Sequence, residues 1–147
     1  MTSLSLFPSR VALLPDHSRG VLATADLAAG TVVGRFEGPV VPWSEVPLAE
    51  VCYVIQVRDD GWMIPRSSAR FINHSCAPNC ALDTTFTLRT LRPVATGEQL
   101  TFSYDALTIA EWRRAPECYF WDERWSFDCY CGAPNCVRRV DRYRIRP

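Results

Sequence analysis

Residues 70–80 read Arg-Phe-Ile-Asn-His-Ser-Cys-Ala-Pro-Asn-Cys. A single Asn-His pair is most simply explained as a turn with a hydrogen-bonded core histidine. Two further blocks follow this stretch along the chain. Residues 97–104 read Gly-Glu-Gln-Leu-Thr-Phe-Ser-Tyr, and residues 129–136 read Cys-Tyr-Cys-Gly-Ala-Pro-Asn-Cys. The three blocks together therefore indicate a site rather than an isolated turn.

The tail block has the spacing C-x-C-x4-C, with a glycine and a proline that bend the backbone so that three thiols can face one centre. Structural zinc prefers four ligands in a tetrahedron, with Zn–S distances near ~2.3 Å, so a fourth ligand must come from elsewhere. The alternative is a set of ordinary buried or free thiols. The candidates for the fourth ligand are Cys52, Cys76, Cys80, Cys118, His17 and His74.

Composition limits the class of protein. The chain has 147 residues, which fits one domain, and its 16 basic residues balance 16 acidic ones. Zero net charge disfavours nucleic-acid binding through phosphate contacts. Every basic residue is arginine, so an enzyme that modified lysine could not modify itself. No apolar run of about 18 residues and no secretory signal are present, which predicts an intracellular protein that spans no membrane. In a reducing compartment, seven cysteines indicate metal binding or catalysis rather than disulfides.

Short apolar stretches alternate with turn signals along the chain. The pattern predicts strands around a turn at residues 28–30, and a hairpin whose strands flank Asp59-Asp60-Gly61. One helix is expected at residues 107–114, and a helical turn broken by Pro47 within residues 43–51. This favours a mainly β fold of several small sheets. The expected strands are residues 20–24, 31–36, 51–58, 62–64, 85–89 and 99–102.

In this order, the three blocks resemble the SET-domain protein-lysine methyltransferases, and the resemblance extends over residues 18–139. It implies a SET fold of several small sheets, with a knot-like C-terminal segment and a short zinc-bound post-SET tail. The implied division is a lead-in at residues 1–17, a SET domain at residues 18–115 and a post-SET region at residues 116–147. The sequence contains no counterpart of the pre-SET zinc region. The zinc ligands that the resemblance implies are Cys76, Cys129, Cys131 and Cys136.

The resemblance also implies roles in a methyl transfer that uses S-adenosylmethionine. Tyr104 is the expected active-site tyrosine, and Tyr53, placed in a strand, is expected to position the substrate lysine. Phe102 stands where a phenylalanine leaves room for di- or trimethylation. Asn73 and His74 are expected to hold the methionine and adenine parts of the cofactor. The full set of expected cofactor contacts is Ser18, Arg19, Gly20, Arg70, Asn73, His74, Tyr104, Phe127 and Tyr130.

Some residues depart from the family pattern. Ser18 stands at the first position of the family's G-x-G turn, where a positive φ would cost a serine more than a glycine. Ser103 and Pro65 stand where the family often has aspartate, which weakens any prediction of the substrate sequence. The aromatic stretch at residues 115–127 is either a small satellite core or, through Phe127 or Tyr130, a cover for the adenine.

The chemistry expected of such a site begins with the substrate lysine. Its pKa near ~10.4 must fall before the amine can attack, and burial in an aromatic channel lowers it. The expected partner is a protein or peptide that presents a lysine; a histone tail is the usual target of the family. A SET-like domain without catalysis, acting as a peptide-binding or scaffold module, is the alternative, and Ser18 is the main argument for it. A zinc-dependent DNA-binding module conflicts with the zero net charge. The sequence leaves the substrate and the oligomeric state open.

Overall fold

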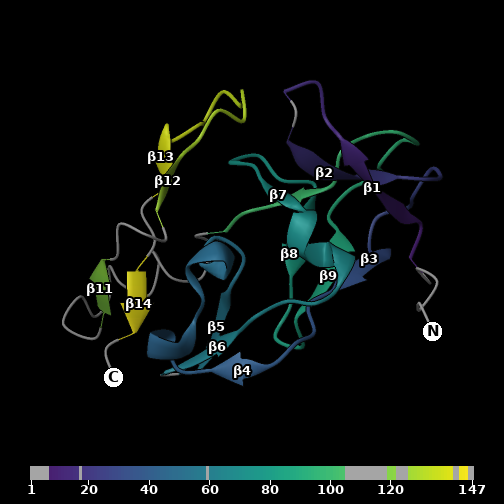
Figure 1. Ribbon diagram of the computed structural model, residues 1–147. Coiled ribbons are helices and arrows are strands. Elements are labelled where there is room, and N and C mark those ends of the chain that lie inside the picture. The colour runs from purple at the N-terminus through teal and green to yellow at the C-terminus, as the bar shows by residue number, and fades with distance from the viewer. Residues whose placement is uncertain are drawn as a thin grey trace.

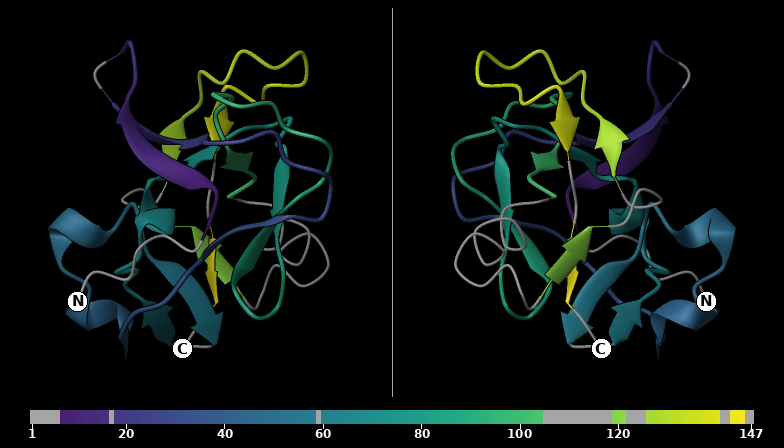
Figure 2. Two further views of the ribbon diagram at one scale, coloured as in Figure 1. Left: turned by 90° about the vertical axis from the view of Figure 1, so that its right-hand side faces the viewer. Right: turned by 90° about the vertical axis from the view of Figure 1, so that its left-hand side faces the viewer.

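The computed structural model describes residues 7–16, 18–58, 60–104, 119–121, 126–140 and 143–145. Within these residues strands dominate, and the helices are three single 3₁₀ turns: η1 (Trp43–Glu45), η2 (Leu48–Glu50) and η3 (Ser68–Phe71). The strands form small sheets of two or three members (Figures 1 and 2). The mainly β fold predicted from the sequence is therefore confirmed. No helix of the described residues is long and apolar enough to cross a membrane.

Three sheets make up the body of the molecule. They are an antiparallel hairpin and two antiparallel three-stranded sheets. In spatial order their strands are β1 (Ser9–Leu13) and β2 (Arg19–Ala23); β3 (Val32–Arg35), β9 (Thr87–Thr90) and β8 (Cys80–Leu82); and β4 (Val40–Val41), β6 (Gly61–Met63) and β5 (Ile55–Arg58).

The other three sheets are two-stranded. One is a parallel pair, and the other two are antiparallel pairs near the C-terminus. They are β7 (Asn73–His74) with β10 (Thr101–Phe102), β11 (Tyr119–Trp121) with β14 (Tyr143–Ile145), and β12 (Phe127–Asp128) with β13 (Arg139–Val140). Figures 1 and 2 place the β1–β2 hairpin and the β12–β13 hairpin at the same end of the molecule.

Two clusters of buried apolar side chains hold these sheets together. The larger includes Leu88, Leu100 and Ile72, each at most 1% exposed, and it packs under β3, β9 and β7. In the smaller, the Trp43 and Trp62 rings pack at a tilt of 57°, with centroids 4.6 Å apart. Large apolar side chains that leave water in this way supply the main drive to fold, at about 25 cal/mol per Å².

Several sequence predictions can be compared with these elements. The predicted hairpin is β5–β6, where Arg58 pairs with Gly61. The strands predicted on either side of residues 28–30 also form, but β2 pairs with β1 and β3 pairs with β9, so the two belong to different sheets. The predicted helix at residues 107–114 lies outside the described residues.

Tyr53 was predicted to lie in a strand, and this is wrong. Residues 51–53 form a turn that continues from η2, because the backbone N–H of Val51 donates to Leu48 O and that of Tyr53 to Glu50 O, at 3.4 and 2.9 Å. Val51 is 3% exposed in the smaller cluster, and its burial favours this turn over the extended form that its β-branched side chain prefers. Tyr53 therefore lies just before β5 rather than in it.

Candidate active site and metal centre

The parallel pair β7–β10 joins two of the three sequence blocks. Thr101 lies opposite Asn73, and Phe102 opposite His74. The buried amide of Asn79 braces the β10 side of this pair: its oxygen accepts from Thr101 N at 2.9 Å, and its Nδ2 donates to Gln99 O at 2.8 Å. A buried amide that is hydrogen-bonded in this way costs little free energy, whereas an unpaired one would cost about 1–3 kcal/mol. The two blocks are therefore aligned side by side.

Tyr104 follows β10 directly, and two hydrogen bonds orient it. Its hydroxyl donates to Ile72 O at 2.5 Å, and its backbone N–H donates to His74 Nδ1 at 3.0 Å. Its ring packs against Phe102, with centroids 4.8 Å apart, and edge-on against Phe127 at 5.7 Å. The hydroxyl is thus held at a fixed point beside the carbonyl end of η3.

His74 links this tyrosine to the cysteine cluster. Because Nδ1 accepts from the Tyr104 backbone, the neutral ring carries its proton on Nε2, which lies 3.3 Å from Cys76 Sγ. The ring also makes edge contacts with Tyr104 and Phe127, at 5.4 and 5.7 Å. The His74 ring is therefore the one side chain in this chain of contacts between Cys76 and Tyr104, so a displacement of Cys76 would also displace Tyr104.

Four thiols converge where the tail meets this region. The sulfurs of Cys76, Cys129, Cys131 and Cys136 lie within 4.8 Å of one another, and Cys76 Sγ is 3.9 Å from Cys129 Sγ. Four sulfurs bound at about 2.3 Å to one tetrahedral ion would lie about 3.8 Å apart. The arrangement therefore fits a structural zinc ion.

The backbone around the thiols is shaped for this convergence. Gly132 takes a positive φ of 76°, and no heavy atom lies within 4 Å of the place where its Cβ would be. Asn135 Nδ2 donates to Cys76 O at 2.8 Å and ties the tail loop to the centre of the domain. Among the other candidates for the fourth ligand, Cys80 is buried elsewhere and Cys52 is exposed, while Cys118 and His17 lie outside the described residues.

The protonation of the thiols differs within the cluster. Burial raises the pKa of Cys129 to about 12 and raises that of Cys76. For Cys131, the backbone N–H of Cys76 is the main cause that lowers the pKa to about 6. Without a cation the cluster would thus hold protons on its buried members, and a metal ion would displace them as it binds.

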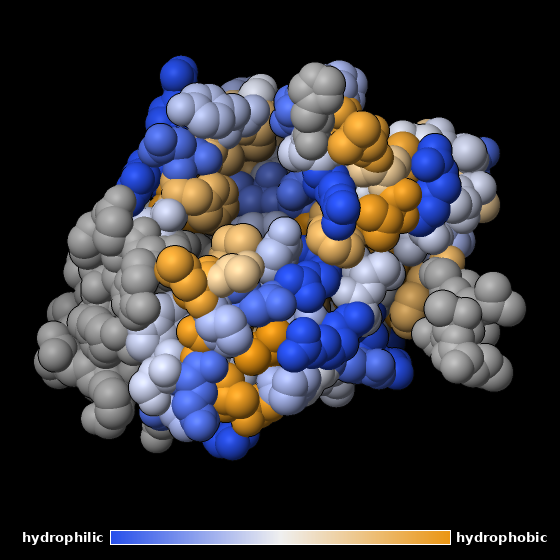
Figure 3. All heavy atoms as spheres, viewed as in Figure 1, coloured by the Kyte–Doolittle hydropathy of each residue, from blue (hydrophilic) through white to orange (hydrophobic). Residues whose placement is uncertain are grey.

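A large cleft of about 760 Å³ opens between the β1–β2 hairpin and the tail. Figure 3 shows this face hollowed near its upper end, with hydrophilic residues on the floor. Most of the predicted cofactor residues line it; the described lining includes Ser18, Arg19, Tyr53, Arg70, Asn73, His74, Gln99, Tyr104, Phe127 and Tyr130. The structure therefore brings together residues from the beginning, middle and end of the chain.

The turn at residues 18–20 lies at the edge of this cleft. The described non-glycine residues with a positive φ are Phe86 and Arg138, so Ser18 is free of the strain that a left-handed backbone would impose. Its N–H and hydroxyl both donate to Asp16 Oδ1, at 3.0 and 2.6 Å. At Gly20 a Cβ would lie 2.9 Å from Gln99 Oε1, so a larger residue there would displace the end of the Gln99 side chain.

Asn73 is held by the same turn. Its Nδ2 donates to Arg19 O and to Gln99 Oε1, both at 2.9 Å. Since both N–H groups of the amide are used within the protein, a ligand contact by this side chain would be accepted by its oxygen. Gln99 was missed in the sequence, because it occupies the variable position of the Gly-Glu-x-Leu block.

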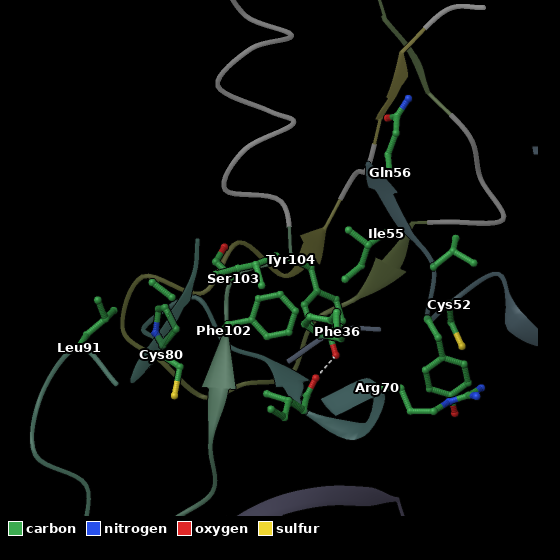
Figure 4. Close-up of a pocket in the computed structure, with 16 residues that line it drawn as sticks. Phe36, Cys52, Ile55, Gln56, Arg70, Cys80, Leu91, Phe102, Ser103 and Tyr104 are labelled. Atoms are coloured by element: carbon green, nitrogen blue, oxygen red, sulfur yellow. Dashed lines mark hydrogen bonds between the residues drawn. The ribbon is translucent and has the colours of Figure 1, made fainter. Parts of the chain in front are cut away.

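A second, apolar pocket of about 350 Å³ lies on the other side of Tyr104. Figure 4 shows Phe102 and Tyr104 at its centre, with Cys52 and Arg70 toward one end and Cys80 and Leu91 toward the other. Phe36 lies against Phe102, with ring centroids 5.6 Å apart. Four described residues line both the large cleft and the apolar pocket: Cys52, Tyr53, Arg70 and Tyr104. The two cavities therefore share one wall.

Comparisons with known proteins match this architecture. A family model described as the SET domain matches residues 18–105, more than half of the chain. The histone-lysine N-methyltransferase trithorax of Drosophila virilis is 30% identical over 144 residues, covering 85% of this chain and 3% of that protein. An H3 lysine-36 specific histone-lysine N-methyltransferase of Cryptococcus neoformans is 36% identical over 81 residues, 48% of this chain and 8% of that protein.

Solved structures with a similar fold were also found. KRYPTONITE in complex with mCHG DNA and SAH is 25% identical with a TM-score of 0.64, covering 91% of this chain and 29% of that one. Its complex with mCHH DNA, an H3(1-15) peptide and SAH has a TM-score of 0.62. This chain thus spans less than a third of the KRYPTONITE chain in either complex and less than a tenth of the two curated relatives. The division predicted at residues 115 and 116 stays a prediction.

Proposed function

Because the chain belongs to the SET domain family, we propose that it is a protein-lysine N-methyltransferase that uses S-adenosylmethionine. The observation that carries this proposal is the wall shared by the large cleft and the apolar pocket, which includes Tyr104, whose hydroxyl is held by Ile72 O. An in-line displacement needs donor and acceptor on opposite sides of one point. Two cavities that meet at a fixed hydroxyl provide that arrangement.

The large cleft is the proposed cofactor site. Its volume of about 760 Å³ lies within the usual range of ligand sites, about 300–1,000 Å³. The Asn73 amide oxygen would accept from the ammonium of the methionine part, because both N–H groups of this amide are used within the protein. Phe127 and Tyr130, both on the tail side, are proposed to cover the adenine. When bound, the cofactor supplies a methyl group on a positively charged sulfur.

The apolar pocket is the proposed lysine site. Tyr53, Phe102 and Tyr104 line it with aromatic rings. A lysine ammonium there loses most of its hydration, which lowers its pKa and releases its proton to water. The neutral amine nitrogen then forms a bond to the methyl carbon while the carbon–sulfur bond breaks and its electron pair stays on sulfur. A neutral thioether and a methylated ammonium are the products.

Tyr104 has two tasks in this scheme. Its hydroxyl proton is committed to Ile72 O, so the oxygen presents its lone pairs to the junction of the two cavities. Those lone pairs favour the partial positive charge that the transferring methyl carries. Tyr53 forms the facing part of the wall and positions the amine. Alignment of this kind is worth about 7–11 kcal/mol in favourable cases.

The four-thiol cluster is the proposed structural zinc site, held by Cys76, Cys129, Cys131 and Cys136. One ion there would fasten the tail to the domain centre and so close one side of the large cleft. Such an ion would be structural, because four thiolates fill its tetrahedral coordination and leave no position open for a substrate.

Phe102 supports the proposal of di- or trimethylation. It is 8% exposed, and its ring lies against Tyr104 and Phe36 without a hydroxyl that could hold a water or an amine. Phe102→Tyr is expected to shift the products on a lysine peptide to monomethyl-lysine, because the added hydroxyl takes the space of one methyl group. Mass spectrometry of the product ladder measures this, and a wild-type enzyme that stops at monomethyl-lysine would refute the idea.

The proposed partner is a protein or peptide that presents a lysine, and the relatives make a histone tail the first candidate. The proposal includes no direct contact with nucleic acid, since the net charge is zero, and no membrane association. It places the protein inside the cell, in the cytoplasm or, where it acts on chromatin, in the nucleus. The alternative, a catalytically inactive SET-like scaffold, loses its main argument because Ser18 is not strained.

The proposal is tested by incubating the zinc-loaded protein with radiolabelled S-adenosylmethionine and core histones, alongside an array of lysine peptides. Labelled methyl-lysine that depends on active protein is the expected result. Protein that transfers no label to any lysine, although it is folded and zinc-loaded, would leave the scaffold alternative.

A further inference from the structure

One side chain in the shared wall carries a charge. Among the described residues that line both cavities, namely Cys52, Tyr53, Arg70 and Tyr104, this is Arg70. Its guanidinium forms an ion pair with Glu50 and donates to Pro65 O at 3.2 Å. The Arg70 and Glu50 side chains are only 18% and 19% exposed, so this pair is shielded from water.

The guanidinium also packs on the aromatic part of the wall. Arg70 Cζ lies 4.2 Å from the centroid of the Tyr53 ring and 5.6 Å from that of Phe71. The two rings meet edge-on, with centroids 6.0 Å apart. Glu50 therefore holds Arg70, and Arg70 holds the Tyr53 ring at the boundary between the cavities.

The charge at this place matters because both proposed ligands are cations. S-adenosylmethionine carries a positive sulfonium, and the substrate lysine arrives as an ammonium. An uncompensated arginine in the shared wall would repel both, and in a partly buried site such repulsion is screened less than at the surface. Arg66, 3.8 Å from Glu50, and Arg19, 5.3 Å from the Phe71 ring, add further positive charge nearby.

We propose that Glu50, which lies outside every sequence block of the site, is a positioning residue for the reaction. It fixes Arg70 against Tyr53 and cancels the arginine's charge, so that the shared wall accepts a cationic cofactor and a cationic side chain. This inference rests on the proposed methyltransferase function. It assigns a role to the short turn η2, which contacts neither ligand in the scheme above.

The test is Glu50→Gln, which keeps the shape and the acceptor oxygen but removes the negative charge. Calorimetry measures the affinity for S-adenosylmethionine and for S-adenosylhomocysteine, which lacks the sulfonium charge. The variant is expected to weaken S-adenosylmethionine binding about tenfold and S-adenosylhomocysteine binding less than twofold. A merely structural role would weaken both equally. Glu45→Gln, at an exposed position in η1, is the matched control and is expected to change neither affinity.

A second variant guards against misfolding. Adding Arg70→Gln to Glu50→Gln removes both charges and is expected to restore the wild-type ratio of the two affinities, even if both fall. Equal losses for the two ligands, or none, in Glu50→Gln would overturn the inference, as would a double variant that keeps the altered ratio. Wild-type protein that binds neither ligand would instead overturn the proposed function.

Discussion

Tyr104→Phe is expected to lower kcat on a lysine peptide by about 10²–10³-fold. The hydroxyl is the polar group that the structure fixes where the two cavities meet, through its 2.5 Å hydrogen bond to Ile72 O. Removing a preorganised polar group at a reacting centre typically costs that much. Single-turnover assays with radiolabelled S-adenosylmethionine measure the effect on the methyl-transfer step itself.

The same variant should change little else. Its backbone N–H still donates to His74, and its ring still packs on Phe102 and Phe127. Affinity for S-adenosylmethionine is therefore expected to stay within about threefold, and the loss of one hydrogen bond should lower the free energy of unfolding by about 1 kcal/mol. A kcat within twofold of the wild type would remove Tyr104 from the mechanism.

Cys76→Ser is expected both to empty the metal centre and to weaken cofactor binding. Cys76 is the one thiol of the four that comes from the middle of the chain, so it is the ligand through which a bound ion would join the tail to the body. Without it, the zinc content should fall from about one equivalent to below a tenth, since binding to a structural site depends on the full ligand set. Elemental analysis of dialysed protein measures this directly.

Further consequences follow from the contacts of Cys76. His74 loses its sulfur partner, and the tail loses the proposed ion that would hold Phe127 beside the large cleft. The melting temperature is expected to fall by about 5 °C or more. Cys52→Ser is the matched control, because Cys52 lies outside the cluster and its loss should leave the zinc content unchanged. A Cys76→Ser variant that retains a full equivalent of zinc would show that the fourth ligand is another residue.

Local sequence signals predicted part of this structure well. The Asp-Asp-Gly turn predicted the β5–β6 hairpin, since turn residues between β-branched stretches act over a few positions. The C-x-C-x4-C spacing predicted three converging thiols, and the resemblance supplied Cys76 as the fourth. In the structure, the parallel β7–β10 pair brings the two central blocks side by side.

Contacts between residues far apart in the chain could not be predicted from local sequence signals. Tyr53 lies in a turn because residues 51–53 continue the hydrogen bonds of η2, which overrides their β propensity. The pairing of Arg70 with Glu50 joins residues 20 positions apart, and that of Asn73 with Gln99 joins residues 26 apart. No local pattern marks Glu50 or Gln99, because their roles depend on how the turns and strands pack.

A calorimetric titration with S-adenosylmethionine, made on zinc-loaded protein and on the same protein after chelation, tests the account most directly. Closure of the large cleft by a metal-held tail predicts one binding site per chain in the loaded protein, and an affinity at least about tenfold lower once the ion is removed. A folded, zinc-loaded chain that takes up no S-adenosylmethionine, or one that binds it equally well without zinc, would contradict it.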